Sequence, residues 1–129
     1  MAQIGYVLLI DDDNIFNFIN KEIIGMENFA VRVSSSVSAK KALEELSCLC
    51  KAGGKNFPDM IFLDINMPRM DGWEFLEEYE KLPQHILDKC RVYMLTSSID
   101  PRDIEKSKKY KSVKDFFSKP LSPEILAML

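Results

Sequence analysis

Three aspartates, Asp11, Asp12 and Asp13, follow directly after the apolar run YVLLI. Like charges repel one another, and a buried carboxylate without a partner is costly. Either these side chains lie in water, or a positive partner belongs among them. Clustered carboxylates form a hard-oxygen site that, with few protein ligands, suits Mg²⁺ better than zinc. A divalent ion would relieve a repulsion of a few kcal/mol between two carboxylates, taking an effective dielectric of about 20.

Three further polar residues each follow another segment that reads as a strand. Asp64 follows MIFL, Thr96 follows VYML, and Lys119 follows KDFFS. A carboxylate can act as a nucleophile and form an acyl phosphate. A divalent ion, a lysine ammonium and a hydroxyl are groups that hold phosphoryl oxygens. If the fold brings these residues together, the set indicates phosphoryl-transfer chemistry.

The elements that must position these residues alternate between strand and helix five times. Strands are expected at residues 6–10, 30–34, 60–63, 92–95 and 114–117. Helices are expected at residues 14–26, 39–51 and 72–82, after Asp100-Pro101, and from Ser122-Pro123-Glu124 onward. This alternation predicts an α/β fold, a doubly wound five-stranded parallel sheet with helices on both faces. In the flavodoxin-like strand order 2-1-3-4-5, the carboxyl ends of the first, third, fourth and fifth strands surround one point.

The first helix is expected to be amphipathic. Ile15, Phe18, Ile19 and Ile23 recur at helical spacing, so they are predicted to form its inner face. The last helix has only about seven residues before the sequence ends, whereas covering helices usually have ~10 or more. The sequence therefore leaves open whether this is a stand-alone protein or part of a longer one.

The composition fits one globular domain over residues 1–129. Hydrophobic residues make up 47% of the chain and charged residues 29%, which is ordinary for such a domain. There is no apolar run near the ~18 residues of a membrane span, and no basic segment typical of a signal peptide. The net charge of −3 gives no reason to expect nucleic-acid binding. We expect a cytoplasmic protein that binds neither nucleic acid nor membrane.

The cysteines also indicate a cytoplasmic protein. There are three, Cys48, Cys50 and Cys90, an odd number without C-x-x-C spacing. This pattern argues against a disulfide framework or a zinc site. Reduced thiols in a cytoplasmic protein are the expected state.

On these motifs the chain resembles a response-regulator receiver domain of two-component signalling, and is similar to the single-domain chemotaxis response regulator. The resemblance runs from YVLLIDD to DFFSKPL. It rests on four motifs in order: the acidic pair Asp11-Asp12, Asp64 in LDINMPRMDG, Thr96 in MLTSS, and Lys119 before a proline. That family also supplies the 2-1-3-4-5 order named above. In it the lysine–proline peptide bond is usually cis.

The resemblance implies a role for each matched residue. Asp64 would be the phosphoacceptor, and Thr96 and Lys119 would contact the phosphoryl group. Mg²⁺, or Mn²⁺, would be the cofactor. Asp12 and Asp64 would bind it directly, Asp11 mostly through water, and the backbone carbonyl of Asn66 would complete the protein ligands. Asp13 lies outside the family motif and is read as a solvated residue or a helix cap.

The resemblance also implies a switch and a partner. Phe116 takes the place of the family's switch aromatic, often a tyrosine, and would move together with Thr96. Asn66 and Ser98 occupy the positions that control hydrolysis and are small, so the phosphorylated state is expected to last seconds to minutes. The phosphoryl donor would be a histidine kinase or a histidine phosphotransfer protein. The domain would catalyse only its own phosphorylation and dephosphorylation and would signal through contacts with an unknown downstream protein.

Three other functions compete with this one. An aspartate-nucleophile phosphatase of the haloacid-dehalogenase type needs a second aspartate two residues after the nucleophile, where this chain has Asn66. A flavodoxin-like binding module needs a phosphate-binding loop after the first strand, where three aspartates would repel phosphate. A degenerate receiver that never takes up phosphate is disfavoured because every key position is filled.

Overall fold

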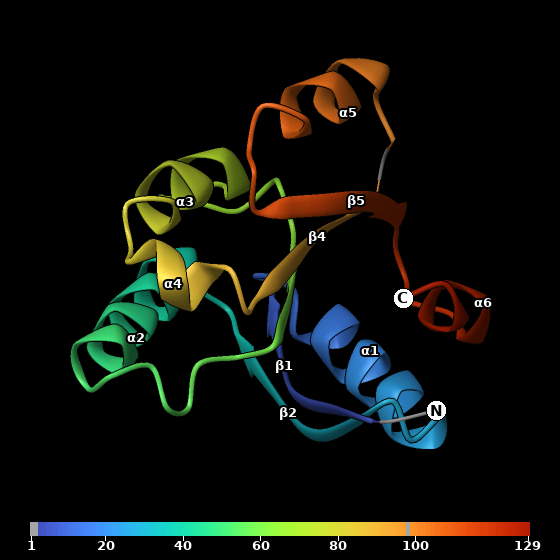
Figure 1. Cartoon of the computed structure of the whole chain (residues 1–129). Helices are drawn as coiled ribbons and strands as arrows, with labels where there is room; N and C mark the ends of the chain where they lie inside the picture. The colour runs from blue at the N-terminus through green and yellow to red at the C-terminus, as the bar shows by residue number, and fades with distance from the viewer. Residues whose placement is uncertain (1–2, 98) are drawn as a thin grey trace.

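The computed structural model describes residues 3–97 and 99–129. Its strands are β1 (Ile4–Ile10), β2 (Ala30–Ser36), β3 (Met60–Leu63), β4 (Arg91–Thr96) and β5 (Val113–Ser118). They form one parallel sheet in the order β2-β1-β3-β4-β5 (Figure 1). The predicted fold class and strand order are therefore confirmed.

The helices cover both faces of the sheet (Figure 1). They are α1 (Asn14–Met26), α2 (Ala39–Lys51), α3 (Gly72–Tyr79), α4 (Gln84–Leu87), α5 (Pro101–Ser107) and α6 (Pro123–Ala127). Helices α2 and α3 pack against one face, and α1 and α6 against the other. Side chains of successive strand residues point to opposite faces, so β3 is buried along its whole length. Each face thus has its own hydrophobic cluster.

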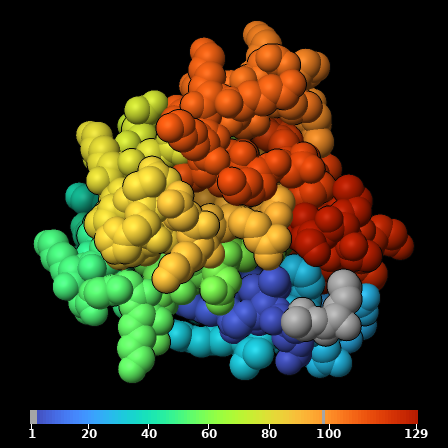
Figure 2. All heavy atoms as spheres, viewed as in Figure 1, coloured from blue at the N-terminus to red at the C-terminus, as the bar shows by residue number. Residues whose placement is uncertain are grey.

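The region between α3 and β4 differs from the prediction of one helix over residues 72–82. Helix α3 ends at Tyr79, and the short helix α4 begins at Gln84. Pro83 explains the break, because a proline disfavours helical backbone in the residue before it. In the space-filling view the α4 region, in yellow, lies between the green α2 region and the orange α5–β5 region (Figure 2). It buries Ile86 and Leu87.

The inner face of α1 was predicted only in part: Ile23 packs against the hydrophobic cluster, but Ile15 and Phe18 do not. Ile15 is 69% exposed and Phe18 64% exposed, whereas the buried residues are Asn17, Asn20 and Ile24. The periodicity was helical, but the helix is rotated so that two amides face inward. Hydrophobic spacing alone misses this arrangement because it assumes that a buried stripe is apolar.

The structure also bears on membrane association. Among residues 3–97 and 99–129, no helix has the length and apolar character needed to cross a bilayer.

Candidate functional site

Adjacent strand ends bring the acidic residues together. Ile10 of β1 lies beside Leu63 of β3 in the parallel register, so Asp11 and Asp64 follow at the same edge of the sheet. One carboxylate oxygen from each of Asp11, Asp12 and Asp64 lies within 4.8 Å of the others. Asp11 is 4% exposed and Asp64 5% exposed, whereas Asp12 is open to solvent.

The lysine that follows β5 enters this acidic cluster. The Nζ atom of Lys119 lies 2.6 Å from Oδ2 of Asp11 and 3.3 Å from Oδ2 of Asp64, and its side chain is only 5% exposed. The backbone N–H of Lys119 donates to the carbonyl of Thr96 at 2.7 Å. The peptide bond between Lys119 and Pro120 is cis, as the sequence resemblance implied. Four motifs spread over more than a hundred residues thus converge at one end of the sheet.

The electrostatics of the site follow from this convergence. Burial, followed by the negative charge of Asp11, raises the pKa of Asp64, although Lys119 and the N–H of Ile65 partly offset the rise. Burial alone would lower the pKa of Lys119, but its hydrogen bond to Asp11 and the charge of Asp64 outweigh that effect and raise it. The lysine ammonium therefore stays charged between two carboxylates.

These donors fit a divalent cation. Three carboxylates against one ammonium leave an excess of two negative charges where the carboxylate oxygens converge. At about 5 Å, two carboxylates repel each other by about 3 kcal/mol if the effective dielectric is about 20. Oxygen donors of this kind, with an open solvent side at Asp12, match the preference of Mg²⁺ for a few carboxylates and several waters.

Local hydrogen bonds fix the acidic loop. Oδ1 of Asp11 accepts from the N–H of Asp13 at 2.9 Å, and Oδ1 of Asp13 accepts from the N–H of Ile15 at 2.8 Å. Asp13 therefore caps α1, one of the two roles expected for it. Oδ1 of Asp64 accepts from the N–H of Ile65 at 2.8 Å.

Gly72 allows the loop after β3 to fold back against the site. Its N–H donates to the carbonyl of Ile65 at 2.8 Å. A Cβ at this position would lie 2.5 Å from the carbonyl oxygen of Asp64. Only glycine fits this close approach without a shift of the backbone.

The remaining predicted residues lie around this centre. Thr96 ends β4 and is 1% exposed. Phe116 pairs with Met94, two residues before Thr96, so it lies on the same face of the sheet as Thr96 and is half-buried there. Asn66 is exposed, two residues beyond Asp64. Ser98, expected to influence hydrolysis, lies outside the described residues.

Sequence reasoning missed three residues of α1 that contact this site. Lys119 Nζ lies 4.5 Å from the ring centroid of Phe16. The side chain of Asn17 donates to the carbonyl of Asp11, and that of Asn20 accepts from the N–H of Leu121. The available signal was an Asn-x-x-Asn spacing followed by Ile24, which is also one helical stripe.

Comparison with known proteins identifies the family. The chain belongs to the response regulator receiver domain family, whose model matches residues 7–129. It is similar to a two-component response regulator from Cytophaga hutchinsonii, with 38% identity, coverage of 98% of this chain and 94% of that one, and a TM-score of 0.90. It is also similar to the chemotaxis protein CheY4 of Vibrio cholerae, with 25% identity, coverage of 98% and 95%, and a TM-score of 0.73.

A curated relative extends the comparison. The chain is 30% identical over 121 residues to a probable methanogenesis regulatory protein, FilR2, from Methanothrix harundinacea, covering 93% of this chain and 75% of that protein. The fold is thus CheY-like, and the family is a signalling family. The phosphatase and flavodoxin-like alternatives are set aside on this evidence.

Proposed function

We propose that residues 1–129 act as one receiver domain that accepts a phosphoryl group on Asp64 from a phosphohistidine. The observation that carries this proposal is the position of Asp64, a buried carboxylate flanked by Asp11 and Lys119. Burial raises the pKa of Asp64, and a carboxylate of higher pKa is a better nucleophile once ionised. The donor would be a histidine kinase or a histidine phosphotransfer protein.

The acidic cluster would hold Mg²⁺ or Mn²⁺. Asp12 and Asp64 would bind the ion directly, Asp11 through water, and the Asn66 carbonyl would complete the set; the grouping of the three carboxylates supports this assignment. When bound, the ion would neutralise charge that develops on the phosphoryl oxygens.

The side chains of this chain would carry the transfer itself. An Oδ atom of Asp64 would attack phosphorus, forming an acyl phosphate as the P–N bond to the donor histidine breaks and the imidazole leaves. Lys119 would hold one phosphoryl oxygen, a role supported by its position 3.3 Å from Asp64. The hydroxyl of Thr96 would donate to another phosphoryl oxygen. The domain would thus catalyse only its own phosphorylation and the later hydrolysis.

Phosphorylation would change the conformation of the surface formed by β4 and β5. Once drawn to the phosphoryl group, Thr96 would leave space that Phe116, on the same face, would fill. This is a two-state shift biased by new hydrogen bonds. The output would be a contact with a downstream protein rather than with nucleic acid. We expect this cytoplasmic signal to last seconds to minutes because Asn66 and Ser98 are small.

The test is intact mass after incubation with acetyl phosphate, with and without Mg²⁺. We expect a Mg²⁺-dependent gain of one phosphoryl group in the wild type and none in Asp64→Asn. Asp88→Asn, an exposed residue before β4 at the opposite end of the sheet, is the matched control and should react normally.

Absence of the adduct has two causes that a second probe separates. Beryllofluoride binding by folded wild-type protein would indicate a phosphoryl-aspartate too short-lived for mass measurement. If the folded wild-type protein gives no phosphoryl adduct and also fails to bind beryllofluoride, the proposed function is contradicted and a degenerate receiver is favoured.

A further inference from the structure

Two buried asparagines on α1 call for an explanation. Asn17 is 3% exposed and Asn20 1% exposed, and together with Ile24 they form the inner stripe of the helix. A buried amide is costly unless it is hydrogen-bonded. A leucine at either position would pack without that cost, and the same helix exposes Ile15 and Phe18. Stability alone does not account for this inverted pattern.

Asn20 is attached to the segment that carries the site lysine. Its Oδ1 accepts from the N–H of Leu121 at 3.0 Å, across 101 residues of sequence. On the other side, the N–H of Lys119 donates to the carbonyl of Thr96 at 2.7 Å. The segment of residues 119–121 is therefore hydrogen-bonded to β4 through Lys119 and to α1 through Leu121, with Pro120 between them.

Phe16 contacts the same lysine directly. The Lys119 ammonium lies 4.5 Å from the Phe16 ring centroid, within the range of a cation–π interaction. Phe16 and Asn20 are four residues apart, so they lie on one side of the helix. Two side chains of α1 thus restrain the lysine segment: Phe16 contacts the Lys119 ammonium, and Asn20 binds the backbone two residues further on, at Leu121.

Asn17 forms a hydrogen bond with Asp11, a residue of the acidic cluster. Its Nδ2 donates to the carbonyl of Asp11 at 2.8 Å. Its Oδ1 is buried and has no hydrogen-bond partner among the described residues. Asn17 lines, together with Asp11 and Asp64, a gap that is too small to hold a water molecule. The Asn17 side chain therefore lies beneath the acidic cluster, next to Asp11 and Asp64.

We propose that α1 sets the geometry of the site through two positioning residues, Asn17 for Asp11 and Asn20 for Lys119. The inference rests on the proposed function, because it assigns these two residues to the phosphoryl site. Asn17 fixes the backbone of Asp11, whose carboxylate would reach the ion through water, and Asn20 holds the segment that places the Lys119 ammonium beside Asp64. Neither residue touches the reacting atoms.

The Asn20 half is tested with Asn20→Leu and Asn20→Asp. Leucine removes the acceptor for the Leu121 N–H, whereas aspartate is isosteric and keeps an acceptor oxygen. For Asn20→Leu we expect amide exchange at Leu121 to be at least about 10-fold faster. We also expect phosphorylation by acetyl phosphate at saturating Mg²⁺ to be about 10-fold slower, because small displacements of a catalytic group are costly. The Mg²⁺ Kd should change less than about 2-fold, and Asn20→Asp should restore the Leu121 exchange rate and the phosphorylation rate.

The Asn17 half is tested with Asn17→Leu. A residue that orients a metal ligand typically changes metal affinity 10- to 100-fold, so we expect the Mg²⁺ Kd to rise about 10-fold in titrations followed by NMR. The matched control is Asn14→Leu, because Asn14 is an exposed asparagine of the same helix. It should leave Mg²⁺ affinity and phosphorylation rate unchanged. Circular dichroism checks folding, and Asn20→Ala replaces Asn20→Leu if the latter does not fold.

The outcomes separate this inference from the proposed function. If Leu121 exchanges faster in Asn20→Leu but phosphorylation is unchanged, Asn20 is only structural and the inference is wrong. An unchanged Mg²⁺ Kd in Asn17→Leu overturns its other half. If the wild type is not phosphorylated at all, the proposed function fails. The inference is then decided by the Mg²⁺ Kd in Asn17→Leu and the NMR signal of the Lys119 ammonium in Asn20→Leu: unchanged values overturn it, and changed values support it.

Discussion

The two faces of the sheet are built from different kinds of residue. Among residues 3–97 and 99–129, the cluster beneath α2 and α3 contains seventeen buried hydrophobic residues, and the cluster beneath α1 and α6 contains ten. Helix α1 adds one fully buried aliphatic side chain, Ile24, alongside two buried amides. Because buried apolar area is the main source of stability, the α2–α3 face should contribute more to it.

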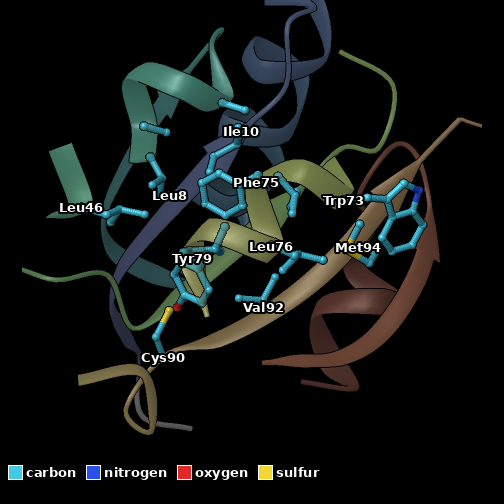
Figure 3. Packing of buried hydrophobic residues seen from close by; sticks show 14 of the residues in the cluster. Leu8, Ile10, Leu46, Trp73, Phe75, Leu76, Tyr79, Cys90, Val92 and Met94 are labelled. Atoms are coloured by element: carbon cyan, nitrogen blue, oxygen red, sulfur yellow. The ribbon is translucent and has the colours of Figure 1, made fainter. Parts of the chain in front are cut away.

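The α2–α3 face is also the less polar of the two. Phe75 and Tyr79 stack with their ring centroids 5.5 Å apart, and the Tyr79 hydroxyl points toward Cys90 (Figure 3). Burial raises the pKa of the Cys90 thiol to about 12 and also raises the pKa of Tyr79, so both groups stay neutral. The other face instead leads up to the ion pairs of Lys119. We therefore expect the α2–α3 face to contribute mainly to stability and the α1–α6 face to position the charged groups of the site.

The largest expected effect falls on the apolar face. Phe75 is fully buried, so Phe75→Ala removes a large side chain and leaves a cavity that costs about 3–5 kcal/mol. Urea unfolding gives the free energy of unfolding. Phe75→Leu, which refills most of the volume, should lose much less. A loss below about 1 kcal/mol in Phe75→Ala would contradict the assignment of stability to this face.

Gly72 joins that face to the site, and its substitution should affect both. A Cβ there would meet the Asp64 carbonyl oxygen at 2.5 Å, so Gly72→Ala must shift backbone and should cost about 1–3 kcal/mol. We also expect weaker Mg²⁺ binding, measured by titration. Gly25→Ala is the matched control: a Cβ there meets nothing within 4 Å, and an alanine within α1 should stabilise by about 0.5–1 kcal/mol. Equal effects of the two substitutions would refute the close-contact argument.

Much of the fold could be predicted because its signals are local. The short apolar runs ending at Ile10, Leu63 and Leu95 are typical of central parallel strands, and each was placed within a few residues of its observed bounds. The acidic residues and Lys119 could be grouped in advance because parallel strands end at the same edge. The prediction therefore followed from topology rather than from side-chain geometry.

The inner face of α1 could not be predicted by the same reasoning. Asn17 and Asn20 are buried because Asp11 and Leu121 offer them hydrogen-bond partners, and Leu121 is 101 residues from Asn20. Hydrophobic periodicity contains no information on such distant partners. The break before α4 was a different miss, since Pro83 is visible in the sequence.

A smaller change of opposite sign in the free energy of unfolding is expected at Asp64, the proposed phosphoacceptor. Burial and the charge of Asp11 raise the pKa of Asp64 above its ordinary value of 3.8, so the folded state binds this proton more tightly than the unfolded state does. Ionised Asp64 therefore destabilises the fold, and the cost grows as the pH rises through the folded-state pKa. In EDTA at neutral pH, Asp64→Asn should stabilise by about 0.5–2 kcal/mol, the range typical of a single stabilising substitution.

The pH dependence checks the cause of that stabilisation. Below pH 3.8 Asp64 is protonated in both states, so the advantage of Asp64→Asn should disappear in urea unfolding at low pH. Asp88→Asn, at an exposed site, should show neither the gain nor its loss. A stabilisation that persists unchanged below pH 3.8 would exclude desolvation as its origin.

The smallest expected effect lies on the outer surface of α1. Phe18 is 64% exposed, so Phe18→Ser removes little buried area and should change the free energy of unfolding by less than about 0.5 kcal/mol. Phosphorylation by acetyl phosphate should also be unchanged, because acetyl phosphate needs no docking surface. Because Phe18 and Asn20 lie on the same helix, comparing Phe18→Ser with Asn20→Leu separates the effect of the inner contacts of α1 from that of its outer surface. A loss of stability above about 1 kcal/mol in Phe18→Ser would instead favour the hydrophobic face that periodicity predicted, with Phe18 inside.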